Sequence, residues 1–475
     1  MRTLIVSTVL LAMPFLGTAN IEAANHYIRA DATGNGTGND WTNACTGFTG
    51  ACAPSTMVRG DTYYIADGSY GSVTFNRATS GTSVITIKKA TVANHGTESG
   101  WISSYGNGQA IFNSPITFSS SYWTLDGATR NESNWFSTAD YGFQISNNGN
   151  AAQRQIIFGS PISNLAVKYT WVQGRTGSYS GAERRYAIDC ETGGTSTDLL
   201  FHRMLVTDSN QHWFIRNTNR TTIEYSAADR MSGNDTNHGN SINLYYSAEN
   251  SIIRFNQWRD IGYPGWSGVT NIISIADANN SSTKPNTWIY GNLAYRFSGG
   301  DGAFGFLGNS VNGGNCTNCR VYNNTLVDGN MQFNGGWGIQ FPQGTGNIAQ
   351  NNLFMSGTRG RTAGNTPSLD LGSGATNSHQ AYGTGGNGSG SNAQNNVPLS
   401  IFRNYTNDDY NLTGPTAAGI PITENAPDGG SLNVDMFGCI RGADGLWDRG
   451  ALEYPSCVGN STAQPPPAPT NLIVN

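Results

Sequence analysis

Short apolar runs, each interrupted by one polar residue and then resumed, recur along the middle of the chain. In NSIIRFNQWRDI (250–261) the amide of Asn256 follows Ile253 and precedes Trp258. The same interruption returns in WIYGNLAY around Asn292, RVYNNTLV around Asn324 and IAQNNLFM around Asn352. Runs of this length, bounded by polar residues, are typical of short β-strands joined by corners.

The interruptions define a repeat. The markers are Ser160, Arg203, Ser226, Asn256, Asn292, Asn324 and Asn352, and the last five intervals are 23, 30, 36, 32 and 28 residues. Residues three positions before and two positions after every marker are apolar. This period predicts a solenoid whose coils stack at the spacing of β-strands, about 4.8 Å. An amide at the same corner of successive coils can bond to its neighbours above and below, so we interpret the markers as a structural ladder.

The composition agrees with an all-β chain. Of the 475 residues 61 are Gly, 12% are charged and 37% are hydrophobic. Gly tolerates the positive φ angles of tight turns, and the hydrophobic share is too high for a disordered chain. The formal net charge of −5 gives no general attraction to nucleic acid or anionic membranes, so we expect neither as a partner.

These features resemble the right-handed parallel β-helix of the pectate-lyase-like superfamily over roughly residues 60–410. The start YIRADATGNGTGNDWTNA (27–44) resembles the N-terminal cap of secreted bacterial members. The stretches NYTNDDYNLTGPTAAGI (404–420) and DMFGCIRGADGLWDRGALEY (435–454) resemble their closing segment. The resemblance implies an all-β, right-handed parallel β-helix with an asparagine ladder and an N-terminal cap. The superfamily includes lyases, hydrolases, epimerases and non-catalytic adhesins, so the fold alone does not assign a function.

The ends of the chain predict export. Residues 1–24 combine Arg2, a short apolar run and small residues, as a cleavable signal peptide does. We expect the cap at 25–60, the β-helix with its closing segment at 61–457, and a Pro-rich linker at 458–475 that leads toward a further module. The mature protein is expected to be a monomer outside the cell or in the periplasm, without a membrane span.

The seven cysteines agree with an oxidising compartment. We predict three disulfides between neighbouring cysteines and a free Cys190. The pairs are Cys45–Cys52, Cys316–Cys319 and Cys439–Cys457. Zinc is the alternative for the Cys316-x-x-Cys319 pair, but no second pair or nearby histidine cluster completes a four-ligand site.

In the superfamily the substrate cleft usually follows the first strand of each coil. The resemblance places such strands at YGFQISNN (141–148), RRYAIDCET (184–192), HWFIRN (212–217) and GNSINLYY (239–246). Strict alternation then points Tyr186, Ile188 and Cys190 inward. The outward set in the middle coils is Arg185, Asp189, Glu191, His212, Arg216, Asn243 and Tyr245, and the loops that enter these strands add Asp208, His238, Tyr263 and Trp266.

The first hypothesis for this set is a lyase that cleaves a uronate-containing polysaccharide by β-elimination. Ca²⁺ held by Asp189 and Glu191, together with Asp208, or else Arg216, would neutralise the substrate carboxylate. His212 and Tyr245 would divide the base and acid roles. The expected substrate-binding residues are Arg185, Asn243, His238, Tyr263 and Trp266.

Three alternatives stay open. A glycoside hydrolase could use Asp189 and Glu191, whose backbones are about 6.5–7 Å apart on one strand face. A non-catalytic glycan binder could use the same face without an acid–base pair. The charged residues could also neutralise one another as a salt-bridge patch without function.

Overall fold

The protein is described here from a computed structural model. The structure describes residues 23–146, 154–174, 186–231, 239–262, 270–276, 283–297, 303–308, 315–329, 337–355, 368–384 and 388–457. The predicted signal peptide lies, apart from its last two residues, outside these ranges, and so does the predicted linker at 458–475. No helix among the described residues is long and apolar enough to cross a membrane.

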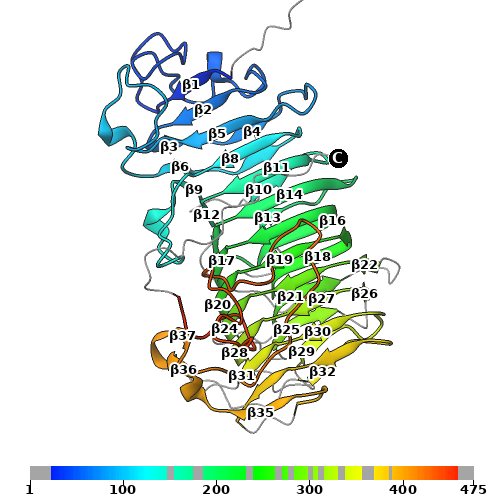
Figure 1. Ribbon diagram of the computed structural model, residues 1–475. Helices are drawn as coiled ribbons and strands as arrows, with labels where there is room; N and C mark the ends of the chain where they lie inside the picture. Colours follow the sequence, from blue (N-terminus) through cyan, green and yellow to red (C-terminus); the bar gives the residue numbers. More distant parts are fainter. Residues whose placement is uncertain are drawn as a thin grey trace, which may run out of the picture.

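The described chain winds through three columns of parallel strands, which confirms the predicted parallel β-helix (Figure 1). The first strands of the coils are β4 (Val73–Phe75), β7 (Ile116–Phe118), β10 (Arg154–Phe158), β13 (Tyr186–Asp189), β16 (Gln211–Glu224), β18 (Gly239–Glu249), β21 (Thr270–Ala276), β25 (Ala303–Gly308), β29 (Trp337–Gln340) and β32 (Ser368–Asp370). β16 continues through the bend into the second column, with a register shift between Arg216 and Thr218.

The second column begins in the predicted cap. It comprises β1 (Asn25–Ile28), β2 (Thr62–Ile65), β5 (Ile85–Lys89), β8 (Trp123–Asp126), β11 (Ser163–Lys168), β14 (Ser196–His202), the end of β16, β19 (Ile252–Arg254), β23 (Trp288–Tyr290), β27 (Arg320–Tyr322), β30 (Ile348–Gln350) and β33 (Thr376–Ser378). Two short strands, β22 (Thr283–Pro285) and β26 (Asn315–Thr317), pair beside it.

The third column forms a separate 12-stranded sheet. Its strands are β3 (Gly68–Tyr70), β6 (Ala110–Phe112), β9 (Phe143–Ser146), β12 (Thr170–Gln173), β15 (Leu205–Thr207), β17 (Ala227–Met231), β20 (Gln257–Ile261), β24 (Leu293–Phe297), β28 (Thr325–Gly329), β31 (Leu353–Met355), β34 (Ala381–Gly383) and β35 (Gln394–Val397). The segment 141–148, expected to be a first strand, contains β9 of this column, because every strand of a coil has the same alternating pattern.

One buried core fills the interior of the coils. The apolar positions three residues before the later markers, Ile223, Ile253, Ile289, Val321 and Ala349, all belong to it. Each of these side chains stacks on its counterpart in the next coil, because the register pairs them directly. The predicted core of these coils is therefore confirmed.

Side-chain amides connect the coils at the corner between the second and third columns. Asn256 Nδ2 donates to Asn292 Oδ1, Asn292 Nδ2 to Asn324 Oδ1, and Asn324 Nδ2 to Asn352 Oδ1, at 2.9–3.1 Å. The run continues to Gln380, at 3.0 Å from Asn352. Each oxygen also accepts the backbone N–H of the preceding amide residue, so these buried polar groups are satisfied.

Two of the earlier markers do not occupy this corner position. Met204 stands there instead of Arg203, because its N–H donates to Ser226 Oγ. Arg203 is one residue earlier, with a φ of 52°. In the preceding coil the corner position belongs to Thr170, the first residue of β12, because the register of the third column aligns Thr170 with Met204. Ser160 does not occupy this position.

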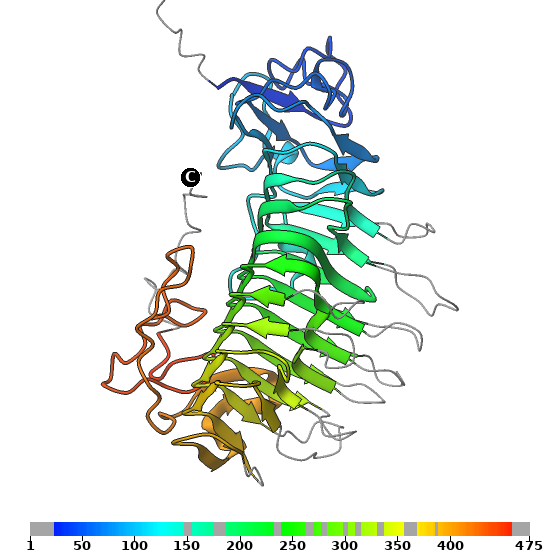
Figure 2. The same cartoon turned by 90° about the vertical axis from the view of Figure 1, so that its right-hand side faces the viewer.

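A second apolar cluster lies outside the third column, where the C-terminal segment packs against it. Leu205, Leu293 and Leu353 of the third strands contact this cluster from one side. Ile422, Leu432, Met436 and Leu452 of the C-terminal segment contact it from the other. Figure 2 shows this segment running beside the lower coils. The last described strands, β36 (Phe402–Asn404) and β37 (Asp409–Leu412), form an antiparallel pair.

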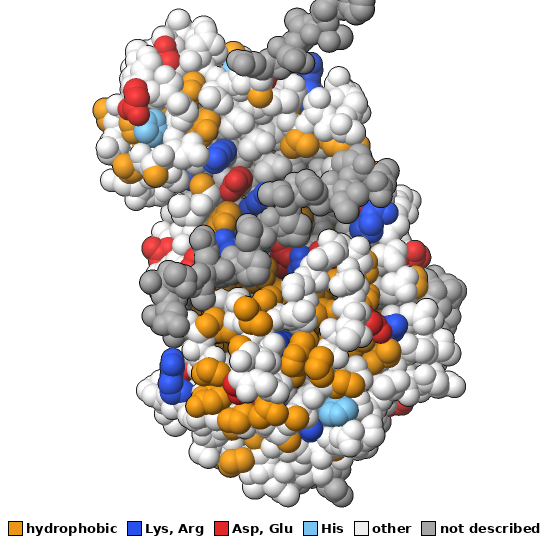
Figure 3. Space-filling view, in the orientation of Figure 1, with side chains coloured by type: hydrophobic (Ala, Val, Ile, Leu, Met, Phe, Trp, Pro, Cys, Tyr) orange, Lys and Arg blue, Asp and Glu red, His pale blue; other side chains and the backbone are white. Residues whose placement is uncertain are grey.

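Short 3₁₀ turns complete the described structure at Gly50–Cys52, Ser103–Tyr105, Thr138–Asp140, Leu399–Ile401 and Tyr405–Asn407. The three predicted disulfides are present, and Cys190 is a buried free thiol. The Cys316–Cys319 bond replaces the zinc alternative. In Figure 3 charged side chains are scattered among uncharged ones, in keeping with a chain only 12% charged.

Candidate functional site

The first strands of the middle coils contain a step in which two consecutive side chains face the interior. Ala187 and Ile188 of β13 both belong to the interior core, as do Ile272 and Ile273 of β21. The register places His212 and Ser241 at the same level as Ala187 and Ile272. A doubled inward step of this kind is a local bulge that repeats from coil to coil. Residues before it point opposite to the direction that strict alternation predicts.

His212 consequently lies inside the coil and not on the outer face, which corrects its predicted position. Its side chain is fully buried, and its Nδ1 atom lies 2.8 Å from Ser241 Oγ. Burial lowers the pKa of His212 to about 3. A neutral imidazole enclosed in the core cannot reach a polysaccharide and is a weak base, so we withdraw His212 from the catalytic set.

Tyr186 faces outward for the same reason. Its ring stacks on that of Phe214 of the next coil, with centroids 4.4 Å apart and planes inclined by 14°. Phe214 pairs in register with Asp189. The outer face of β13 and β16 therefore combines an aromatic pair with a carboxylate.

Two arginine–carboxylate pairs lie on this outer face. Arg154 Nη1 is 2.8 Å from Asp189 Oδ2, and the Glu191 N–H donates to Asp189 Oδ1 at 2.8 Å. Arg216 Nη1 forms an ion pair with Glu191. Arg154, which is 48% exposed and begins β10, was missed in the sequence because the marker Ser160 made its strand a second strand, whereas β10 belongs to the first column. Ion pairs of the kind that the salt-bridge hypothesis expects are therefore present, whereas its claim that the patch has no function stays a prediction.

Aromatic rings enclose Arg216 on its other side. Its Cζ atom lies 4.3 Å from the ring centroid of Tyr246 and 5.9 Å from that of Tyr245. The Tyr245 ring is 5.5 Å from Phe214 and 4.6 Å from Tyr246. The ring of Tyr245 is therefore held beside a guanidinium, on the face where the sequence predicts the substrate.

The described carboxylates do not form the predicted calcium site. Asp208 receives two hydrogen bonds from Arg230, at 2.8 and 2.9 Å, and belongs to the corner after β15. Asp189 and Glu191 each face an arginine. Ca²⁺ needs six to eight oxygen ligands, and in the described ranges no three acidic, His or Cys side chains gather around one point. These residues do not fit a calcium ion, so we correct the metal assignment.

The remaining predicted residues divide into two groups. Asn243 lies on the outer face, where its Nδ2 donates to Gln211 Oε1 at 3.2 Å. Arg185, His238, Tyr263 and Trp266 lie outside the described residues, and their predicted contacts with substrate stay predictions.

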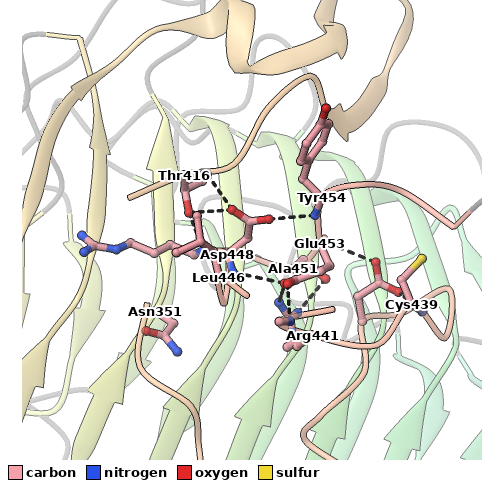
Figure 4. Close-up of polar contacts among 12 residues, drawn as sticks. Asn351, Thr416, Cys439, Arg441, Leu446, Asp448, Ala451, Glu453 and Tyr454 are labelled. Atoms are coloured by element: carbon pink, nitrogen blue, oxygen red, sulfur yellow. Dashed lines mark hydrogen bonds and ion pairs between the residues drawn. The ribbon is translucent and has the colours of Figure 1, made fainter. Parts of the chain in front are cut away.

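A second cluster of titratable side chains lies in the C-terminal segment (Figure 4). Asp448 accepts the N–H groups of Thr416 and Tyr454, at 2.6 and 2.7 Å. Glu453 accepts the N–H groups of Gly442 and Asp448, and it faces Arg441 at 3.3 Å. Because backbone donors occupy these buried carboxylates, we assign the cluster to structure and not to chemistry.

Comparisons with known proteins concern architecture. No protein-family model and no curated protein matches this sequence. The fold is similar to that of pectate lyase Pel9A, with 13% identity, a TM-score of 0.48 and coverage of 90% of this chain and 96% of that one. The PL6 family alginate lyase AlyGC has 12% identity and a TM-score of 0.33, with coverage of 72% of this chain and 51% of that one. The GH136 lacto-N-biosidase from Eubacterium ramulus has 9% identity and a TM-score of 0.30, with coverage of 79% of this chain and 68% of that one. At these identities the activity has to be argued from the residues.

Proposed function

We propose that the protein is a polysaccharide lyase that cleaves a uronate-containing polysaccharide by β-elimination. The observation that supports this proposal is the juxtaposition of Arg216 and Tyr245 on the outer face of β16 and β18. Glu191 contacts Nη1 of Arg216, whereas the enclosed Nε atom has no hydrogen-bond partner. An enclosed donor without a partner is costly, and a carboxylate from a ligand would satisfy it.

The proposed reaction needs three events at one uronate residue. The guanidinium of Arg216 pairs with the substrate carboxylate and stabilises the negative charge that develops when C5 loses its proton. The phenolate of Tyr245 takes that proton. The C4–O4 bond then breaks, a C4–C5 double bond forms, and the phenol returns the proton to the departing O4. Tyr245 carries the base and acid steps because His212 is inside the coil.

The hydrolase hypothesis is less well supported by the same residues. A glycoside hydrolase needs one protonated carboxylic acid beside the scissile oxygen. Asp189 and Glu191 each face an arginine, and such a partner favours the charged form of a carboxylate.

Export is part of the proposal. Three disulfides suit an oxidising compartment. The proposed substrate is a polymer, which the protein would encounter outside the cytoplasm. The proposed partner is the acidic polysaccharide itself.

The test is an assay on uronate polymers that follows two signals together, ultraviolet absorbance of unsaturated uronate and new reducing ends. We expect both signals from the wild type. Arg216→Ala should lower kcat/KM by about 100-fold or more, and Tyr245→Phe by about 100- to 10,000-fold, with folding retained.

Matched controls come from the same strands. Arg220→Ala removes an exposed arginine of β16 that pairs with Asp198, and Tyr246→Phe keeps the ring beside Arg216. We expect near-normal activity from these two variants. Reducing ends without absorbance would show hydrolysis, and binding without either signal would show a glycan binder, so each result would contradict the proposal.

A further inference from the structure

The outer face of the first strands changes character after Arg216. Residues 239–246 of β18 and all of β21, β25 and β29 contain no Asp, Glu, Lys or Arg. The segments that enter the last three of these strands, 262–269, 298–302 and 330–336, contain one charged residue, Asp301. The described charged groups of this face therefore lie on the coils of β10, β13 and β16 and, beyond this uncharged stretch, at Asp370 of β32, whose register partner is Gln340.

Amide side chains take the place of charges on the coils that follow. Asn243 Nδ2 donates to Gln211 Oε1 at 3.2 Å, and Asn271 Nδ2 donates to Asn240 Oδ1 at 2.5 Å. All four residues point outward, because the side chains that follow Gln211, Asn240 and Asn271 make the inward step described above. The two contacts form an amide patch beside the charged coils.

Two acceptors of the amide patch have no partner. Asn243 Oδ1 and Asn271 Oδ1 are enclosed and accept no hydrogen bond. Asn271 is 1% exposed and Asn243 5%, so an unpaired oxygen at either site is unfavourable. Such an oxygen can accept a hydrogen bond from a hydroxyl or N–H group of a ligand. An ionised carboxylate has no proton to donate and cannot satisfy it.

From this division we infer that the substrate is a mixed polysaccharide, in which the uronate bound at Arg216 is followed by uncharged, hydroxyl-bearing sugars over the amide patch. This inference rests on the proposed function. A homopolymer of uronate would place a carboxylate beside coil after coil, at the strand spacing of about 4.8 Å. Desolvating those carboxylates beside amide oxygens, with no cation, would oppose binding.

Binding by the Tyr245→Phe variant tests this inference independently of turnover. Affinity electrophoresis or calorimetry would compare homopolymers of galacturonate, mannuronate and glucuronate with polymers that alternate uronate and neutral sugar. We expect an alternating polymer to bind at least tenfold more tightly than every homopolymer. Equal or tighter binding of a homopolymer would overturn the inference while leaving the lyase proposal intact if that polymer is also cleaved by the wild type.

Substitutions in the amide patch locate the effect. Asn243→Leu and Asn271→Leu remove the acceptors, and each should weaken binding of the alternating polymer by about three- to tenfold, the value of one neutral hydrogen bond. Asn286→Ala is the control, because its amide is exposed and bonds to Asn250 at another corner. Unchanged affinity in both leucine variants, with native melting temperatures, would overturn the inference. Absence of binding to every uronate polymer would overturn it together with the proposed function.

Discussion

The Nδ1 atom of His212 lies 2.8 Å from the hydroxyl of Ser241, its neighbour in the next coil, inside the β-helix. His212 lies between Ala187 in the preceding coil and Ser241 in the next one, and Ile272 continues this interior level one coil further. This polar pair therefore contributes to the packing of the coils and to the pH dependence of folding.

His212→Gln should change stability in acid and leave turnover unchanged. The pKa of His212 is lowered to about 3 in the folded chain, against an ordinary 6.5. Between these values the unfolded chain binds more protons, so the folded state loses stability as the pH falls from 6.5 toward 3. We expect the melting temperature of the wild type to fall more steeply than that of the variant between pH 6.5 and 4. A large loss of kcat with an unchanged melting curve would show that the side chain reaches the substrate.

Chelation should not abolish activity on the polymer that the protein cleaves. The carboxylates predicted to bind calcium are paired with Arg154, Arg216 and Arg230, and Arg216 is proposed to neutralise the substrate. We expect the ultraviolet signal in EDTA to stay within about twofold of the untreated rate, at constant ionic strength. Complete loss in EDTA that added calcium restores would assign carboxylate neutralisation to a metal.

Asn324→Ala should destabilise the β-helix strongly. The Asn324 amide donates to Ile289 O and Asn352 Oδ1, and its oxygen accepts two bonds from Asn292. Truncation leaves several buried groups without partners, each worth about 1–3 kcal/mol, so we expect a loss of about 3–5 kcal/mol in the free energy of unfolding.

Asn286→Ala provides the comparison for this measurement. Its amide is exposed and should change the free energy of unfolding by less than about 0.5 kcal/mol in urea denaturation. Similar losses in the two variants would contradict a special role for the buried corner.

Arg254→Met should loosen the contact between the C-terminal segment and the coils. Arg254 Nε lies 2.7 Å from Glu224 Oε2, and Nη2 lies 2.9 Å from Asp428 Oδ2. The arginine and His202 hold the pKa of buried Glu224 at about 2. Removal of the arginine leaves this buried charge poorly compensated, which costs about 3–5 kcal/mol.

Hydrogen exchange locates the loosening. We expect faster exchange around residues 428–432 in Arg254→Met and, more weakly, in Asp428→Asn. Arg403→Ala, which removes an exposed ion pair with Asp409, should leave exchange there unchanged. Unchanged exchange in all three variants would show that the apolar cluster alone holds the segment.

The coils were predictable from sequence because their signal is local and repeated. Ile253 and Val321 could be assigned to the interior because each precedes an amide by three residues in its coil. The inward step at Ala187 and Ile188 has no such signal. Both residues are apolar, so the sequence does not distinguish two consecutive inward side chains from strict alternation. One missed step reversed the predicted direction of His212.

Contacts between distant segments were not predictable in the same way. Arg254 meets Asp428 across 174 residues, and no local pattern relates the two positions. Arg203 was taken for a ladder residue because a polar side chain adjoins the true corner residue, Met204, which is apolar. The charged residues of the candidate site could be selected from the sequence because charges are few in this chain, and their function stays a prediction.

Glu453→Gln should flatten the pH dependence of stability near neutrality. Burial raises the pKa of Glu453 to about 7 from an ordinary 4.5, and the pKa values of its neighbours Asp435 and Asp448 are also raised by burial. Arg441 faces this group as a cation (Figure 4). Between pH 4.5 and 7 the folded chain binds more protons than the unfolded chain, so stability falls as the pH rises through this window.

The variant resembles the protonated acid, so its melting temperature should fall less than that of the wild type between pH 5 and 8. Hydrogen exchange of residues 434–457 should show the same difference, because the cluster joins these residues to Thr416. Asp31→Asn is the control, since that carboxylate is 78% exposed, and it should reproduce the wild-type curve. Parallel curves for the wild type and Glu453→Gln would show that Glu453 stays ionised across the window, with Arg441 and the backbone N–H groups compensating its charge.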